Sequence, residues 1–461
     1  MKEYDSYKDS GIEYLNKIPA HWQELRMRFI GYLYGGLSGK SANDFNQLTN
    51  EDNKCFIPFT NIANNFRIDP ESLQTVVIAE NEKQNKVKKG DLFFLMSSEN
   101  YDDVGKSAVL LDDLEETYLN SFCKGFRITK ENIVPKFLNY QLHSKQLRHN
   151  LLTGANGFTR INLKIDKVID LLTALPPLVE QTSIASFLDR KTSEIDDIIA
   201  DKKRLLELYE EEKTAIINQA VTKGLDPNAP MKDSGIEWLG EIPEHWEAVK
   251  LKYIAKVQTG RTPKIQNSKI DYFENGTINW FTPSDMDGSQ ELVNSKRSII
   301  IEAVENDEVE LFSEYSIFLV SIGATLGKVG FSKEQASANQ QINVITFLDK
   351  VFDPIFGYYY IVGNKEMITL QADYTTLPIL NQSKTKDLLF SFPPIQEQES
   401  IVHHIESECS KIDFKKARTE ELIELLTEYR TALISEVVTG KIKVIEDCKN
   451  NKGASQYYQD H

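Results

Sequence analysis

Two Gly-Lys dipeptides could hold a lysine against a phosphate, and each resembles the end of a nucleotide-binding loop. Before Gly105-Lys106-Ser107, that pattern needs a glycine five residues ahead of its last glycine, but Asn100 stands there. In the second segment Gly323 is one residue too close to Gly327-Lys328, and Val329 replaces the Ser or Thr that would hold magnesium. Both segments therefore argue against ATP binding by this chain.

Other catalytic patterns are missing as well. His21 and His245 each precede a tryptophan and have no Cys, Asp or His at ligand spacing, which indicates a structural role. A methyltransferase needs a glycine-rich cofactor loop and an Asn/Asp-Pro-Pro-aromatic tetrad, whereas the proline pairs here follow Leu175 and Phe392. The sequence has neither H-E-x-x-H nor G-x-S-x-G, and its four cysteines form no C-x-x-C. We predict no catalytic residue, no metal site and no cofactor site in this chain.

Polar, glycine-bearing loops are the remaining candidates for chemistry. The segment 154–160, Gly-Ala-Asn-Gly-Phe-Thr-Arg, can approach a nucleic-acid backbone closely through its glycines. Asn156 suits an adenine edge, and Arg160 suits guanine or a phosphate. A nearby run of lysines could form a basic edge. The predicted DNA contacts of the first half are Lys83, Lys86, Lys88, Lys89, Ser98, Lys106, Asn156, Thr159 and Arg160.

The second half offers hydroxyl and amide groups in its loops. Its predicted DNA contacts are Thr282, Ser284, Lys328, Gln340, Gln341, Thr375 and Thr376. Each of these residues, taken alone, is also explained as a solvated loop residue. The prediction therefore rests on the loops as a set.

A tandem repeat must position these loops. Residues 8–22 read KDSGIEYLNKIPAHW and residues 232–246 read KDSGIEWLGEIPEHW, with eleven of fifteen positions identical. Such identity between distant segments indicates a duplication. Each half then continues with a globular region, within 1–175 and 225–392, for which short apolar runs such as 91–96 and 316–320 predict an α+β fold.

A long helix closes each half. Segments 176–224 and 393–440 both begin with Pro-Pro, share Glu-Gln, and end in Gly. Apolar residues at gaps of three, four and seven predict one narrow stripe on a rod of roughly 60–65 Å, which needs a partner helix. The predicted stripe consists of Ile184, Leu188, Ile195, Leu205, Tyr209 and Ile216 in the first helix and Ile401, Ile405, Ile412, Leu422 and Leu433 in the second. The alternative is two unrelated amphipathic helices, but amphipathicity does not require the shared flanking residues.

Composition limits the remaining possibilities. A chain of 461 residues should hold two or more domains, and no apolar run reaches membrane-spanning length. The Met1-Lys2-Glu3 start is not that of a signal peptide, so we predict a cytoplasmic protein with a polar tail at 441–461. A net charge of −16 argues against a protein that coats nucleic acid. Any DNA contact should be confined to local faces or shared with a more basic partner.

The two KDSGIE-x-L-x-x-IP-x-HW motifs, the Gly-Lys segments and the two PP-x-x-EQ helices together resemble the specificity (S) subunits of type I restriction–modification systems. The resemblance covers nearly the whole chain. It implies an α+β fold with two similar target recognition domains, at 1–175 and 225–392. These would be joined by an antiparallel two-helix coiled-coil spacer, 176–224 and 393–440, in a pseudo-twofold tandem repeat.

The same resemblance implies the activity and the partners. Each domain would read one half of a split site in double-stranded DNA, and the helices would dock two methyltransferase (M) subunits. Motor–nuclease (R) subunits would complete the restriction complex. S-adenosylmethionine, ATP and Mg would belong to those partners, and this chain would be non-catalytic. Two alternatives remain at this stage: a coiled-coil scaffold without direct DNA readout, and a nucleotide-driven enzyme that uses the Gly-Lys segments.

Overall fold

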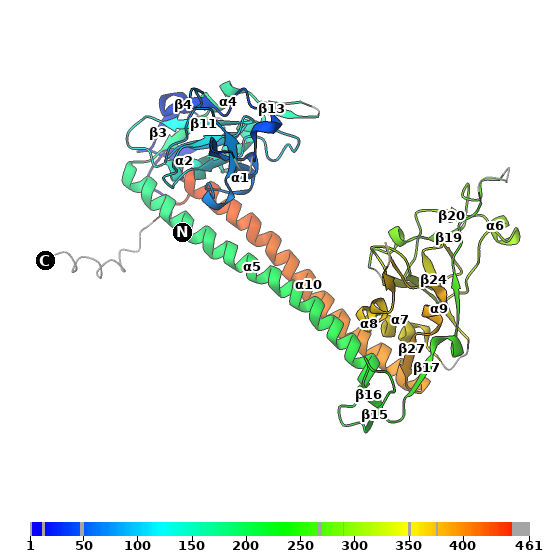
Figure 1. The fold of residues 1–461 in the computed structure, drawn as a ribbon. Coiled ribbons are helices and arrows are strands. Elements are labelled where there is room, and N and C mark those ends of the chain that lie inside the picture. Colours follow the sequence, from blue (N-terminus) through cyan, green and yellow to red (C-terminus); the bar gives the residue numbers. More distant parts are fainter. Residues whose placement is uncertain are drawn as a thin grey trace. The chain divides into compact units, whose positions relative to one another are not determined.

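The computed structural model describes residues 2–11, 14–46, 50–157, 159–264, 270–288, 290–348, 352–374 and 377–444. The chain forms two compact units. Unit 1 comprises Met1–Lys202 with Glu421–His461, and unit 2 comprises Lys203–Glu420. Each unit holds one α+β region, called head 1 or head 2 below, and a share of two long helices, α5 and α10 (Figure 1).

The central sheet of head 1 has four antiparallel strands in the order β4-β11-β7-β9. Their bounds are β4 Gly31–Gly35, β11 Cys123–Ile128, β7 Leu92–Leu95 and β9 Ser107–Val109. All four residues of strand β7 are buried. Since successive side chains point to opposite sides of a sheet, both faces of this strand are covered. Leu92 and Phe94 join the core cluster of α2, Pro135–Leu142, while Phe93 and Leu95 join a second cluster with Ile62.

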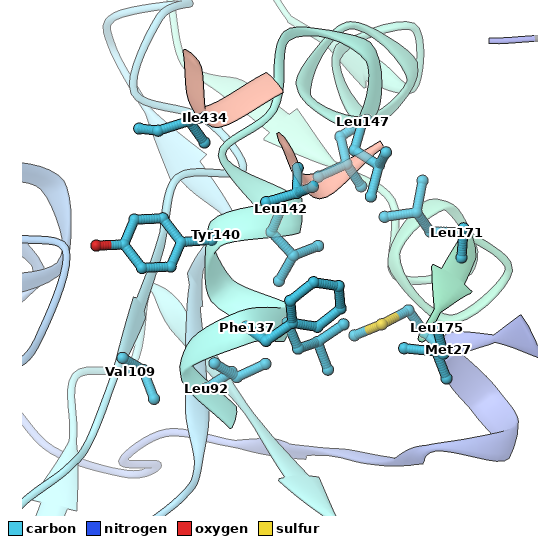
Figure 2. Packing of buried hydrophobic residues seen from close by; sticks show 14 of the residues in the cluster. Met27, Leu92, Val109, Phe137, Tyr140, Leu142, Leu147, Leu171, Leu175 and Ile434 are labelled. Atoms are coloured by element: carbon cyan, nitrogen blue, oxygen red, sulfur yellow. The ribbon is translucent and has the colours of Figure 1, made fainter. Parts of the chain in front are cut away.

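The first of these clusters is the core of unit 1. Leu92 and Val109 of the sheet lie beside Phe137, Tyr140 and Leu142 of α2 (Figure 2). Ile434 of α10 and Ile184 of α5 belong to the same cluster. The ends of both long helices are therefore part of the core of this unit.

Smaller elements complete head 1. A three-stranded sheet has the order β10-β5-β6, and its β10–β5 pairing is parallel. A second has the order β12-β13-β8, and the pairs β1–β2 and β14–β3 are antiparallel. The bounds are β1 Tyr7–Asp9, β2 Lys17–Pro19, β3 Gln23–Arg26, β5 Asn53–Ile57, β6 Gln74–Val77, β8 Ser97–Ser98, β10 Thr117–Leu119, β12 Ala155–Asn156, β13 Ile161–Leu163, β14 Leu172–Leu175, α1 Phe59–Asn64, α3 Lys145–Leu152 and α4 Ile165–Ile169, with single 3-10 turns at Met27–Phe29, Ala42–Asp44 and Pro70–Ser72.

Head 2 repeats the strand order of the central sheet and of the mixed three-stranded sheet, but among the described residues β25 pairs with β26 alone where head 1 has the sheet β12-β13-β8. Its central sheet, β18-β24-β21-β22, packs on α7, and β19 pairs in parallel with β23 and antiparallel with β20. The predicted duplication of an α+β fold is thereby confirmed. The bounds are β15 Met231–Asp233, β16 Glu241–Pro243, β17 Glu247–Lys250, β18 Ala255–Thr259, β19 Ile278–Phe281, β20 Ser298–Ile299, β21 Ser316–Val320, β22 Val329–Ser332, β23 Ser337–Ala338, β24 Ile342–Phe347, β25 Asp373–Tyr374, β26 Pro378–Ile379, β27 Leu389–Phe392, α6 Glu302–Glu305, α7 Pro354–Gly363, α8 Lys365–Leu370 and α9 Gln382–Lys386, with 3-10 turns at Leu251–Tyr253 and Pro283–Asp285.

The long helices run through Leu178–Lys223 (α5) and Ile395–Val438 (α10), as predicted. Each is followed by a glycine in the left-handed region, Gly224 at φ 75° and Gly440 at φ 77°, which ends the helix. In unit 1, Asp196 of α5 forms an ion pair of 2.8 Å with Arg430 of α10.

The helices also meet in unit 2, where Lys213 of α5 lies 2.9 Å from Asp413 of α10 and Glu210 pairs with Lys416. The pairing is antiparallel, since α5 begins in unit 1 and ends in unit 2 while α10 does the reverse. The alternative of two unrelated helices is wrong.

The predicted apolar stripe needs one correction. Ile184, Leu188, Ile195, Ile401, Ile405, Ile412 and Leu433 are buried, and Leu205, Tyr209 and Ile216 are half-buried. Leu422, however, is 39% exposed. The buried positions lie toward the helix ends, where the cores of the heads cover much of the stripe. The helices alone therefore bury less of the stripe than its periodicity suggested.

The two histidines have structural partners. His21 Nε2 lies 2.7 Å from a carboxylate oxygen of Glu180, in the first turn of α5. His245 Nε2 lies 2.6 Å from the matching Glu397 of α10. The repeated His-Trp motif and the repeated Glu-Gln pair therefore meet in space in both units. At the other end of the chain Lys443 N–H donates to Lys2 O at 2.9 Å, so the predicted tail is attached at its start; residues 445–461 lie outside the described ones.

Candidate nucleic-acid interface

The small β12-β13-β8 sheet of head 1 brings several predicted contacts together. Asn156 pairs with Asn162 across the hairpin, and Ser98 pairs with Ile161 on the other side. Arg160 immediately precedes β13 and stacks its guanidinium over the ring of Phe122 at 4.7 Å. Asn156, Thr159 and Arg160 are exposed, and Ser98 is half-buried. Side chains from three separate stretches of sequence thus share one surface of the head.

A glycine makes this hairpin possible. Gly157 has φ +144°, and a Cβ at this position would lie 2.0 Å from the carbonyl oxygen of Arg160. No other residue type fits here without moving the backbone. The sequence suggested that the glycines of this segment allow close approach to DNA. Gly157 instead has a structural role, which is to let the chain turn toward Arg160.

The predicted lysine edge lies in the segment that leads into β7. Lys83, Lys86, Lys88 and Lys89 are all exposed. Lys86 forms an ion pair of 2.6 Å with Glu116, and the hydrogen bonds from Lys86 and Lys54 lower the pKa of that carboxyl group to about 2. Exposed pairs of this kind contribute little free energy, so phosphates can replace the carboxylates.

The two Gly-Lys lysines have partners inside their own heads. Lys106 Nζ donates to Ala63 O at 3.1 Å and to Asp103 Oδ1 at 2.6 Å. Lys328 Nζ donates to Met286 O at 2.9 Å. Both lysines are half-buried, and a phosphate would have to displace these bonds. Gly105 at φ 72° and Gly327 at φ 86° turn the chain just before these lysines. Each lysine then bonds to the corresponding segment within its own head.

The predicted contacts of head 2 gather around the β19–β23 pair. Thr282 Oγ1 donates to Asp285 Oδ2 at 2.6 Å and lies 2.8 Å from Ser284 Oγ. Gln340 is exposed, and its Oε1 accepts a hydrogen bond from Thr262 at 2.5 Å. The backbone ties these groups together, because Asn339 N–H donates to Phe281 O at 2.9 Å. Thr375 and Thr376 lie outside the described residues.

Matching turns carry different residues in the two heads. Asn120 accepts a hydrogen bond from the backbone N–H of Phe122 at 3.0 Å, and Asn339 accepts one from Gln341 at 3.0 Å. Phe122 and Gln341 therefore occupy the same place in the fold. Sequence reasoning missed Phe122 because an aromatic residue suggests a core position, but Phe122 is 45% exposed. The framework is shared, and the side chains that it presents are not.

Charge is distributed unevenly along the chain. Residues 1–177 hold 22 Lys and Arg against 23 Asp and Glu, a net charge of −1. Residues 224–394 hold 15 against 23, a net charge of −8, and α5 with α10 hold 12 against 20, also −8. The acidity of the protein therefore resides in head 2 and the helices. Head 1 is the less repulsive surface for a phosphate backbone.

Metal sites and membrane-spanning helices are absent from the part of the chain that the structure describes. Within it, no group of three or more His, Cys, Asp or Glu side chains is placed to hold a metal ion. None of its helices is long and apolar enough to cross a membrane.

The chain resembles known proteins in sequence over most of its length. The family model described as "Type I restriction modification DNA specificity domain" matches residues 37–208 and 243–424. The MjaVIII specificity subunit of Methanocaldococcus jannaschii is 24% identical over 95% of this chain and 97% of its own length. The StySPI specificity subunit of Salmonella potsdam is 20% identical over 92% of this chain and 90% of its own.

Solved structures share the fold. A chain from a structure on assembly and conformational transition of the type I R-M system superposes with a TM-score of 0.70, at 14% identity, over 92% of this chain and 99% of that one. The HsdS subunit of Thermoanaerobacter tengcongensis gives a TM-score of 0.55, also at 14% identity, over 92% of this chain and 98% of that one.

Proposed function

The chain belongs to the family of type I restriction–modification DNA specificity subunits, and on this premise we propose that each head reads one half of a split DNA target. One observation carries the proposal. The two heads have the same strand order in their central sheets and the same asparagine turn, yet head 1 presents Phe122 at the position where head 2 presents Gln341. A repeated framework with different side chains at matching positions is suited to recognising two different short sequences.

The antiparallel helices supply the spacing between the half-sites in this proposal. Paired readers on duplex DNA bind half-sites about 34–36 Å apart for one helical turn. Two weak readers held at a matching separation gain affinity through their effective concentration. The interhelical ion pairs, Asp196–Arg430 in unit 1 and Lys213–Asp413 in unit 2, support a fixed register of the two rods.

The same helices would bind two methyltransferase subunits. Leu208 of α5 and Leu425 of α10 occupy equivalent places in the repeat, and they are 47% and 54% exposed. An exposed leucine repeated in each unit fits two identical partners that dock in the same way. The net charge of −8 on the helices favours a partner with a basic docking surface.

Catalysis would then belong to the partners. The methyltransferase subunits would bind S-adenosylmethionine and flip a target adenine out of the duplex. Motor–nuclease subunits would use ATP and Mg. What supports this division is the bonding of Lys106 and Lys328, whose ammonium groups are held by their own heads. This chain would choose the site and hold the partners on it.

The test is a head exchange. Residues 247–392 are replaced by the same region of another specificity subunit, and the methylated adenines are mapped across the genome in cells that also hold the partner methyltransferase. We expect one half of the methylated site to change and the other half to stay. If both halves changed together, or neither did, the heads would not be independent readers. If the methyltransferase complex showed no sequence-selective shift of DNA, this chain would be a scaffold.

A further inference from the structure

We infer that Arg160, stacked on Phe122, reads a guanine base in the half-site of head 1. The inference rests on the proposed function and adds the identity of a reading residue and of its base. Four observations carry it: the anchoring of both side chains, the exposure of the stacked pair, the charge beside it, and the different residues at the same places in head 2.

Both members of the pair are anchored by backbone bonds. The hairpin that leads to Arg160 turns at Gly157 and rejoins the sheet at Ile161, which pairs with Ser98. The Asn162 amide donates to Arg160 O at 3.3 Å. On the other side, Phe122 N–H donates to Asn120 at 3.0 Å, and Phe122 O accepts from Met96 N–H at 3.2 Å. The guanidinium therefore lies over the ring of a residue whose backbone is fixed.

The stacked pair is open to solvent. Phe122 is 45% exposed as a residue, and the side chain of Arg160 is 49% exposed. Stacking occupies the face of the guanidinium and leaves its N–H edge free to donate. A planar fork held in this way matches the O6 and N7 acceptors of guanine in the major groove.

The local charge favours a base over a phosphate. Glu99 lies 4.0 Å from Arg160 Nη2 and is 81% exposed. The Glu99 carboxylate repels the full negative charge of a phosphate more strongly than the partial charges on O6 and N7 of guanine.

Head 2 has different chemistry at the same two places. Gln341 stands where head 1 has Phe122, and Leu377, just before β26, stands where head 1 has Arg160. Leu377 is 52% exposed. Leu377 has no guanidinium and Gln341 has no ring, so head 2 cannot form the same stacked pair. The guanine contact therefore belongs to one half-site only.

The experiment maps methylated adenines in cells that hold the partner methyltransferase and one variant of this chain. Arg160→Gln and Arg160→Lys remove the fork, and Phe122→Leu removes the stacking ring while Phe122→Tyr keeps it. We expect preference for one guanine in one half-site to fall by roughly 5- to 100-fold in the first three variants. Phe122→Tyr should keep the wild-type site, and the other half-site should be unchanged in all four.

Arg190→Gln is the matched control. Arg190 also lies over a phenylalanine ring, that of Phe187 at 5.7 Å, but on α5 rather than in a head. We expect its methylated site to equal that of the wild type. The inference is overturned if Arg160→Gln weakens methylation equally at all sites without relaxing one position, which is the signature of phosphate contact. A wild-type complex that methylates no split site would overturn the proposed function instead.

Discussion

Trp22 donates its indole N–H to Glu180 at 3.2 Å, across 158 residues of sequence, and Trp246 donates to Glu397 at 3.1 Å in the same way. Both tryptophans are fully buried. Each glutamate therefore joins the KDSGIE motif that opens a head to the first turn of the helix that follows it. This relationship explains why the two motifs recur together in both halves of the chain.

Removal of either glutamate should destabilise its unit. We expect Glu180→Ala and Glu397→Ala each to lower the free energy of unfolding by about 1–3 kcal/mol, because a buried indole N–H then has no acceptor. Urea denaturation followed by tryptophan fluorescence measures the loss. Glu194→Ala is the control, since Glu194 forms only exposed pairs with Arg190 and Lys191. If the control lost as much stability as Glu180→Ala and Glu397→Ala, the bond to the tryptophan would not be the cause.

The repeated leucines predict a stepwise loss of partners. We expect Leu208→Asp or Leu425→Asp to weaken binding of one methyltransferase subunit by about 30-fold or more, and the double variant to lose both. Native mass spectrometry or sedimentation counts the bound subunits. Val179→Asp is the control, because Val179 is 78% exposed but its counterpart in the repeat is Gln396. Two subunits still bound to the double variant would place the docking surface elsewhere.

The helix pair predicts a measurable change of spacing. Four residues inserted after Lys202, with four more after Ile423 in the antiparallel helix, lengthen the pair by about 6 Å. This is close to two base pairs of duplex DNA at about 3.4 Å each. Genome-wide methylation mapping should then show a changed gap between the half-sites. Replacement of four residues at each position, without insertion, should leave the gap as it was; an unchanged gap in the insertion variant would mean that the rods do not set it.

His143 predicts a pH dependence of unit 1. Its Nε2–H donates to Ser107 O at 2.7 Å, and burial lowers the pKa of the imidazole to about 4. An unfolded chain takes up this proton near pH 6.5, so stability is complete above pH 6.5 and falls as the pH drops toward 4. We expect a loss of roughly 1–3 kcal/mol over this window.

The check is denaturation at several pH values. His143→Gln should flatten the profile between pH 6.5 and 4, whereas substitution of His149, an exposed residue of α3, by Gln should keep the wild-type slope. If the stability of the His143→Gln protein fell with pH as steeply as that of the wild type, other titrating groups would be the cause of the pH dependence.

The bonds of the two Gly-Lys lysines predict that their removal lowers stability and changes no activity. Lys106→Ala and Lys328→Ala remove donors to Ala63 O and Met286 O, and we expect each to cost about 1–2 kcal/mol. The methylated sequence should be unchanged, and the isolated chain should hydrolyse no ATP with or without the substitutions. ATP hydrolysis that disappears in either variant would restore the nucleotide-driven alternative.

Much of the architecture could be predicted from the chain alone. The repeated KDSGIE motif revealed two copies of one fold, and the paired apolar periods predicted α5 and α10 nearly to their ends. These signals are strong because a duplicated sequence must fold twice under the same local constraints. An apolar period typical of a helix that persists over more than forty residues also excludes a strand for this segment.

The tertiary structure decided which residues face solvent and which partners they take. Leu422 has the spacing of a buried position but lies exposed. Lys106 stands in a motif typical of phosphate ligands but bonds to Ala63. Phe122 is of a residue type typical of cores but stacks on Arg160 at the surface. Periodicity and motif are properties of neighbours along the chain. Burial and hydrogen bonding depend on segments that fold together from far apart, and only the tertiary structure brings β8, β13 and the turn at Asn120 together in the surface that carries Arg160 and Phe122.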